Sequence, residues 1–235
     1  LGAAMALTLV TGCSTGSEDS GKQKLVVSTW GLSQDVWEQE VKIPFEEKYN
    51  CELVLDTGGT NDRYTKLANN PNSEVDIIEL SQSAAANGYE AGLFEQIDYS
   101  KISNASSLIE PAAELAENGF GAAYTVNSIG IIYNPDEVGF EINDWSDLWN
   151  EELKGKISIP DISTTFGPAM VYVANDYANG DIKEDQGEAA FKALAELQPN
   201  IVKTYSKSSD LANMFASGEI AVAVVGDFGI PTIEQ

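Results

Sequence analysis

The sequence predicts an α/β protein of two lobes, each a mostly parallel β-sheet flanked by helices. Three observations lead to this prediction. Short apolar, β-branched runs alternate with patterns of helical periodicity. The alternation occurs in two successive series, and an irregular segment over residues 98–124 separates them. We therefore expect lobe 1 over residues 25–125 and lobe 2 over residues 126–226, with residues 227–235 beginning a return to lobe 1.

The first series predicts three strands and three helices. The strands are apolar runs at residues 25–30, 51–56 and 74–80. The helices are predicted at residues 36–49, 62–69 and 83–91. In the first helix, apolar side chains recur at Val36, Val41 and Phe45, which is the spacing of one helix face. Because a helix follows each strand, the strands are expected to run parallel.

The second series predicts four strands and four helices. The strands are expected at residues 128–133, 156–159, 201–204 and 220–225. The helices are expected at residues 144–151, 167–178, 184–197 and 208–216. Open α/β sheets bind ligands outside the carboxyl ends of their strands, so a cleft between the two lobes is the expected site.

The N-terminal residues have the pattern of an exported lipoprotein. Residues 3–10 form an apolar run that is too short to span a bilayer, and small residues precede Cys13. The sequence Val-Thr-Gly-Cys that ends at Cys13 resembles the bacterial lipobox, which implies a truncated leader over residues 1–13 and a diacylglyceryl anchor on Cys13. Residues 14–24 are polar and suit a flexible tether. The alternatives are a small cysteine buried at the end of a core helix and a disulfide with Cys51, which only the cysteine count favours.

Both ends lead us to expect a piece of a longer protein. The chain opens on Leu1 without a basic leader segment, and residues 230–235 have the pattern of a helix that is just beginning. The C-terminal part of the fold is therefore expected to be missing.

The charge balance excludes several classes of function. The chain has 37 acidic residues, 13 basic residues and no histidine, which gives a net charge of -24. Such a field repels nucleic acid and attracts cations, although acidity of this kind can also serve solubility alone. Without histidine there is no Ser-His-Asp triad and no histidine-ligated metal, and the glycine motifs for phosphates and dinucleotides are absent. We expect no cofactor and no metal, whereas a catalytic pair of carboxylates stays open.

Polar and aromatic residues follow four of the predicted strands. Trp30 closes the first strand, and Glu79 and Ser81 close the third. Asp161 and Asp227 follow two strands of the second series. A tryptophan face attracts an ammonium group, and carboxylates pair with it, so together these residues predict a site for an amine. Taken alone, a tryptophan is more typical of the core and an acidic residue after a strand is more typical of a turn or helix cap, so the prediction depends on their joint placement.

The single arginine, Arg63, lies within the second predicted helix rather than at a strand end. A carboxylate or phosphonate on a ligand is usually bound by an arginine fork. In this chain it would depend on helix N-termini near Thr60 or residues 164–167. Zwitterionic ligands therefore stay open beside cationic ones.

Six stretches carry a resemblance to the polyamine-type solute-binding proteins of ABC importers, the spermidine/putrescine receptor group. They are residues 28–30, 64–67, 75–78, 92–98, 144–149 and 153–156. The most specific is Trp-Ser-Asp-Leu-Trp followed by Lys-Gly. The resemblance implies a type 2 periplasmic-binding-protein-like fold that binds a solute without catalysis and closes its lobes by hinge motion. It also implies ABC permease subunits as partners and an extracytoplasmic location, periplasmic or cell-surface, with Cys13 as the membrane anchor.

In that family a few residues line the cleft, and the corresponding positions here are Trp30, Ser81, Asp161 and Asp227. Two departures imply a smaller or less charged ligand. Thr164 stands where a second acidic residue is usual, and Ser83 stands where a tyrosine is usual. With Glu79, these residues complete the candidate ligand-binding set.

The sequence also bears on functions other than an amine receptor. Related ferric receptors use adjacent tyrosines on the return segment, and residues 226–229 contain none, which disfavours iron. The alternatives that stay open are a secreted hydrolase with a carboxylate pair and, among receptors, a ferric-ion or other small-solute binder.

Overall fold

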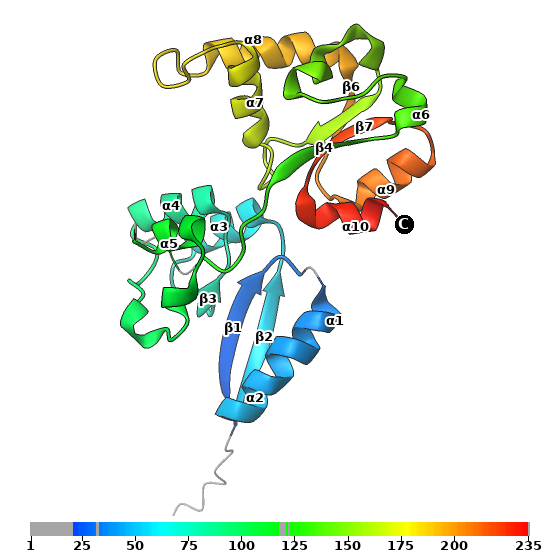
Figure 1. The fold of residues 1–235 in the computed structure, drawn as a ribbon. Helices are drawn as coiled ribbons and strands as arrows, with labels where there is room; N and C mark the ends of the chain where they lie inside the picture. The colour runs from blue at the N-terminus through cyan, green and yellow to red at the C-terminus, as the bar shows by residue number, and fades with distance from the viewer. Residues whose placement is uncertain (1–20, 32, 118–120, 122, 235) are drawn as a thin grey trace, which may run out of the picture.

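The computed structural model describes residues 21–31, 33–117, 121 and 123–234. The predicted leader, Cys13 and most of the predicted tether lie outside the described residues. Within them the chain forms two separate β-sheets, each with helices packed on it (Figure 1). This is the predicted α/β architecture of two mostly parallel sheets.

The first sheet has three parallel strands in the order β2-β1-β3. They are β1 (Gln23–Thr29), β2 (Cys51–Thr57) and β3 (Ile77–Ile78). The third strand is shorter than predicted, because the carboxylate of Asp76 takes the place of a backbone acceptor and receives the N–H of Val26 at 2.8 Å. The parallel pairing of β1 with β3 is limited to Val27 opposite Ile77 and Ser28 opposite Ile78.

Helices cover this sheet on two sides. Figure 1 shows α1 (Gln34–Trp37) and α2 (Ile43–Tyr49) on one side of β1 and β2, joined by a π-helical segment, Glu38–Lys42. On the other side lie α3 (Thr60–Asn69), α4 (Gln82–Glu90) and α5 (Glu110–Glu117). The segment over residues 98–124 is predicted to be irregular, but it contains α5 as well as two short 3₁₀ turns, Tyr99–Lys101 and Ala105–Ser107.

The second sheet has four strands in the order β4-β7-β5-β6. They are β4 (Ile129–Tyr133), β5 (Ile157–Pro160), β6 (Ile201–Tyr205) and β7 (Val222–Gly226). Strand β5 pairs in parallel with β6 and β7, whereas β4 pairs antiparallel with β7. The carboxyl ends of β5 and β7 therefore lie side by side at one edge of the sheet.

The helices of the second sheet are α6 (Pro135–Val138), α7 (Ala169–Tyr177), α8 (Glu188–Leu197), α9 (Ser209–Ala216) and α10 (Ile230–Ile233), with further 3₁₀ turns at Gln198–Asn200 and Asp227–Gly229. The helix predicted at residues 144–151 is wrong. Two 3₁₀ turns, Trp145–Trp149 and Glu151–Leu153, stand there instead. Asn150 between them is extended, and its side chain accepts from the backbone N–H of Glu152, so it begins the second turn and ends the first.

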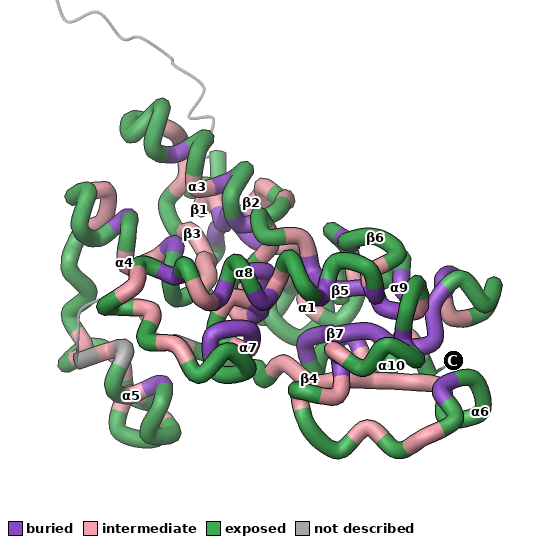
Figure 2. The backbone as a smooth tube through the Cα atoms, turned by 90° about the horizontal axis from the view of Figure 1, so that it is seen from above, coloured by how far each residue is buried: buried purple, intermediate pink, exposed green. Residues whose placement is uncertain are grey.

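The core lies mainly around the second sheet. Figure 2 shows the buried parts of the chain concentrated on β5 and β7. Every residue of β7 is buried, and Leu148, Leu153 and Leu197 are fully buried beside it. Around the first sheet the buried apolar side chains are fewer, and Cys51 on β2 is among them, without a disulfide to any described residue. The second sheet thus has the larger buried core.

Two chain segments matter for the relation between the sheets. The segment that leads into β4 rises from the first sheet to the second (Figure 1). After β7 the chain enters α10, whose Ile230 and Ile233 pack on the cluster around Leu211 and Met214. Residues 230–233 therefore lie with the second sheet, and the expected return to lobe 1 stays a prediction. No helix in the described part of the chain is long and apolar enough to cross a membrane.

Candidate ligand-binding site

Trp30 lies directly after β1, as predicted, and is half-buried. Its indole Nε1 donates a hydrogen bond to Oγ1 of Thr60, the first residue of α3, at 2.8 Å. One face of the ring is covered by Arg63, whose guanidinium carbon lies 4.9 Å from the ring centre. The tryptophan is therefore held at its edge and on one face.

Arg63 was expected only as part of a helix, but its guanidinium lies at the carboxyl end of the first sheet. Nε donates to the carbonyl oxygen of Gly58 at 2.8 Å, and Nη1 donates to those of Ser28 at 2.9 Å and Glu79 at 2.6 Å. Nη2 is buried and has no hydrogen-bond partner among the described residues. Burial lowers the pKa of Arg63, while the negative charges of Glu79 and Asp56 oppose that change. The sequence offered one signal for this placement. Arg63 lies in the first turn of the predicted helix, and helical side chains point towards the helix N-terminus, which here follows β2.

Glu79 follows β3 and contacts both Arg63 and the end of β1. One carboxylate oxygen accepts a short hydrogen bond from the hydroxyl of Thr29. Desolvation, followed by the charge of Glu79, raises the pKa of Tyr124, although most of that side chain is exposed. Tyr124 lies in the segment between the sheets, and sequence reasoning did not select it.

Ser81 and Ser83 lie at the start of α4. Ser81 is the N-cap residue, and its Oγ accepts from the backbone N–H of Ala84 at 3.4 Å. The hydroxyl oxygens of Ser81 and Ser83 are 3.4 Å apart. Ser81 thus has a capping role in the helix, and Ser83 is exposed beside it.

Asp161 follows β5 and is surrounded by hydroxyl and amide donors. Oδ1 accepts from the backbone N–H of Ser163 at 2.9 Å and from its hydroxyl at 2.6 Å, and Oδ2 accepts from the hydroxyl of Thr204 at 3.2 Å. The hydroxyl of Ser163 is the main cause that lowers the pKa of Asp161, followed by the backbone N–H. The carboxylate is therefore held in its charged form.

Thr164 shapes the loop after Asp161. Its hydroxyl donates to the carbonyl oxygen of Asp161 at 2.7 Å and accepts from the backbone N–H of Gly167 at 3.2 Å. Both contacts are local, so this side chain holds the turn that displays Asp161.

Asp227 follows β7 and ties it to the start of β4. Oδ2 accepts from the backbone N–H and the hydroxyl of Ser128 at 3.1 Å and 3.0 Å, and Oδ1 accepts from the backbone N–H of Phe228 at 2.9 Å. The backbone N–H of Ser128 is the main cause that lowers the pKa of Asp227. The side chain is exposed and charged.

An aromatic pair that sequence reasoning missed joins the loops of the two aspartates. The rings of Phe166 and Phe228 are stacked with their centres 5.6 Å apart. Gly226 lies beneath them, because a Cβ there would come within 2.7 Å of Phe228 and 2.9 Å of Phe166. The pair therefore packs the segment after β5 against the segment after β7.

The predicted residues form two groups, one on each sheet. Trp30, Glu79, Ser81 and Ser83 belong to the first, and Asp161, Thr164 and Asp227 to the second. The groups approach one another where Thr60 Oγ1 lies 3.0 Å from Thr165 Oγ1 and where the amide of Asn61 donates to the carbonyl oxygen of Ser163. Both contacts link the first turn of α3 to the loop before α7.

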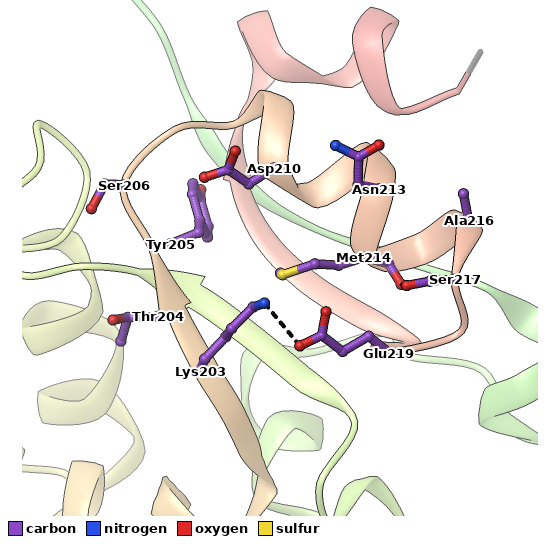
Figure 3. A pocket seen from close by; sticks show the side chains of 10 residues that line it. All are labelled: Lys203, Thr204, Tyr205, Ser206, Asp210, Asn213, Met214, Ala216, Ser217 and Glu219. Carbon is purple, nitrogen blue, oxygen red and sulfur yellow. Dashed lines mark hydrogen bonds and ion pairs between the residues drawn. The ribbon is translucent and has the colours of Figure 1, made fainter.

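A separate open groove lies between β6 and α9 (Figure 3). Lys203 and Glu219 form an ion pair of 2.8 Å across it, and Met214 points its sulfur into it. None of the predicted ligand-binding residues lines this groove. Among the described residues there is also no group of three or more Cys, Asp or Glu side chains that could hold a metal ion.

The model of the bacterial extracellular solute-binding protein family matches residues 41–235. The chain belongs to this family. Solute-binding proteins of this family bind and do not catalyse, so the hydrolase alternative is set aside. The predicted fold class and the resemblance stated from the sequence are confirmed.

Curated proteins that are similar to this chain include polyamine-binding proteins. The spermidine/putrescine-binding periplasmic protein of Escherichia coli is 25% identical over 187 residues, which are 77% of this chain and 53% of that protein. The putrescine-binding periplasmic protein SpuD of Pseudomonas aeruginosa is 25% identical over 238 residues, 94% of this chain and 63% of its own length. This solute-binding chain thus spans about half to two thirds of the length of these relatives.

Solved structures of the family have the same fold. An ABC transporter structure from Clostridium perfringens is 57% identical with a TM-score of 0.76, and the match covers 89% of this chain and 66% of that one. The substrate-binding protein PotD from Streptococcus pneumoniae, a spermidine/putrescine ABC transporter component, is 21% identical with a TM-score of 0.68, covering 91% and 66%. At that identity the second match shows the fold alone.

Proposed function

We propose that this chain is the substrate-binding part of an ABC importer and captures a small amine between its two lobes for delivery to the permease. The polyamine-binding relatives from E. coli and P. aeruginosa support this ligand class. The observation that carries it is the pair of carboxylates at neighbouring strand ends. Asp161 and Asp227 are both held charged, and neither forms an ion pair with any residue in the described ranges.

The hydrogen bonds of these carboxylates leave room for an ammonium group. A carboxylate offers about four acceptor positions. Asp161 and Asp227 each use three of them for neutral donors of the protein. Neutral donors orient a carboxylate without cancelling its charge, so each carboxylate retains both an acceptor position and its attraction for a cation.

Trp30 supplies the other half of the proposed site. With one face on Arg63, the remaining face is the stacking surface for an ammonium group or a methylene chain. In this proposal Glu79, Ser81, Ser83 and Thr164 complete the lining. The lobes 25–125 and 126–226 close on the ligand by hinge motion.

We further propose that Cys13 carries the lipid anchor. The family is extracellular, and the lipobox-like sequence before Cys13 supports attachment to the membrane. Cys13→Ala should release the mature protein from the membrane fraction of the expressing cell. A mutant that is processed and still sediments with membranes would show that the anchor is elsewhere.

Calorimetric titration of the full-length protein tests the ligand class. Putrescine and spermidine are the cationic probes, γ-aminobutyrate the zwitterionic probe and maltose the neutral probe. We expect the diamines to bind most tightly and to be recovered unchanged after incubation. Preference for maltose, or conversion of a bound amine to a product, would overturn the proposal.

A further inference from the structure

Both anchors of Trp30 come from a single turn of α3. Thr60 accepts the hydrogen bond from the indole Nε1, and Arg63, three residues later, covers one face of the ring at 4.9 Å. Residues three apart on a helix lie on the same side, so one helical turn holds both the edge and the face of the indole. Arg63 is only 3% exposed, so its side chain is enclosed by protein atoms where it covers that face.

Arg63 is itself oriented by the whole first sheet. Its guanidinium donates to carbonyl oxygens in β1, after β2 and after β3, at Ser28, Gly58 and Glu79. A planar fork with fixed donor directions has few orientations that satisfy three such acceptors. The position of the Trp30 ring is therefore set by the strand ends through Arg63, rather than by Trp30 alone.

We propose that Arg63 is a positioning residue of the ligand site, which covers one face of Trp30 and holds the opposite face as the stacking surface. The chemistry of the stacked group rests on the proposed amine-binding function. The positioning of Trp30 by Arg63 does not rest on that function, because it is a property of the ligand-free protein.

Circular dichroism and fluorescence quenching of the ligand-free protein test whether Arg63 positions Trp30. Arg63→Met and Arg63→Lys are made in the full-length protein, each with and without Trp30→Phe, so that subtraction isolates Trp30 from the other tryptophans. We expect Arg63→Met to reduce the near-ultraviolet circular dichroism of Trp30 by about half and to raise its quenching by acrylamide about twofold, because the cation and the cover are lost together. Arg63→Lys keeps the charge and should restore part of both signals. Lys66→Met is the matched control, because it removes a charge from the exposed side of the same helix.

A double-mutant cycle on putrescine affinity then separates positioning from a general structural role. Arg63→Met should weaken binding about tenfold when Trp30 is present and less than about twofold in a Trp30→Ala background, since an effect that acts through Trp30 disappears with it. Equal weakening in both backgrounds, or an unchanged Trp30 signal, would overturn the proposal. If Arg63→Met fails to fold, Arg63→Lys carries the same two comparisons with smaller effects. If neither putrescine nor spermidine binds the parent protein, the proposed function fails, and the optical comparison still decides the role of Arg63.

Discussion

The hydroxyl oxygens of Thr60 and Thr165 lie 3.0 Å apart and join the first turn of α3 to the loop before α7. Thr60 also accepts the indole N–H of Trp30 at 2.8 Å. A hydroxyl has one proton and two lone pairs, so Thr60 can accept from Trp30 and still form a hydrogen bond with Thr165, in which either hydroxyl can donate. The predicted stacking residue on the first sheet is therefore connected to the second sheet through two hydrogen bonds.

Replacing Thr165 by Val should favour the open arrangement of the lobes. The change keeps the size of the side chain but removes a hydrogen bond of about 0.5–1.5 kcal/mol. We expect a longer mean distance between spin labels on α2 and α8, and a putrescine affinity that is weaker by up to about tenfold. Thr232→Val on α10 makes the same chemical change at an exposed position and should alter neither quantity. Identical label distances in Thr165→Val and the parent would show that the contact does not influence closure.

Replacing Asp161 by Asn should separate charged from neutral ligands. The amide keeps the shape and removes the negative charge, so putrescine binding should weaken at least about tenfold while a neutral ligand is little affected. Calorimetry on both ligands measures the difference. Asp136→Asn on α6 makes the same charge change after β4, whose carboxyl end lies at the opposite edge of the second sheet because β4 runs antiparallel to β7. Equal losses in the two variants would assign the effect to net charge and contradict a direct role of Asp161.

The effect of Asp161 on stability should depend on pH in a defined direction. The pKa of Asp161 is lowered from its ordinary value of 3.8, chiefly by the hydroxyl of Ser163. Since folding lowers the pKa, the stabilisation is present above the ordinary value and is lost as the pH falls through the folded value. The melting-temperature difference between the parent and Asp161→Asn should therefore be constant from about pH 5 to 8 and shrink below the ordinary value. A difference that grows towards acid pH would contradict this assignment.

Replacing Gly167 by Ala should disturb the loop that presents Asp161. A Cβ at this position would collide with the carbonyl oxygen of Asp161 and lie 2.5 Å from Cα of Ile162, which are backbone atoms that cannot move aside. We expect a loss of about 1–3 kcal/mol in the free energy of unfolding, measured in urea, and weaker putrescine binding. Gly130→Ala is the control, because its Cβ would meet nothing within 4 Å. A stable Gly167→Ala protein with parental affinity would show that the loop tolerates the shift.

Two replacements of Trp30 should weaken putrescine binding to different degrees. Trp30→Ala removes the stacking face and should cost roughly 1–3 kcal/mol of binding free energy. Trp30→Phe keeps a ring but loses the donor to Thr60, so its affinity should fall between the parent and Trp30→Ala. Trp37→Ala on α1 is the matched control and should bind like the parent. Parental affinity in Trp30→Ala would remove Trp30 from the site.

Local pattern was sufficient for most of the secondary structure. The apolar run at 220–225 predicted a buried strand, and β7 is buried along its whole length. Helical spacing from Val36 onward predicted the first helix, which is continuous apart from a π-helical segment. Such patterns succeed because the residues that determine them are neighbours in the chain. The same local pattern failed at residues 144–151, where the caps Asp144 and Asn150 favour separate 3₁₀ turns.

The candidate site depended more on contacts between distant residues. From the sequence, the alternation of strands and helices determined that Trp30, Asp161 and Asp227 would follow strands. Only the tertiary structure decided that the side chain of Arg63 reaches three strand ends, that Phe166 stacks on Phe228, and that β4 runs antiparallel to β7. Propensity and periodicity describe a residue's own segment. A buried cation or an aromatic ring is placed instead by the acceptors and surfaces of other segments, which come together only when the chain folds.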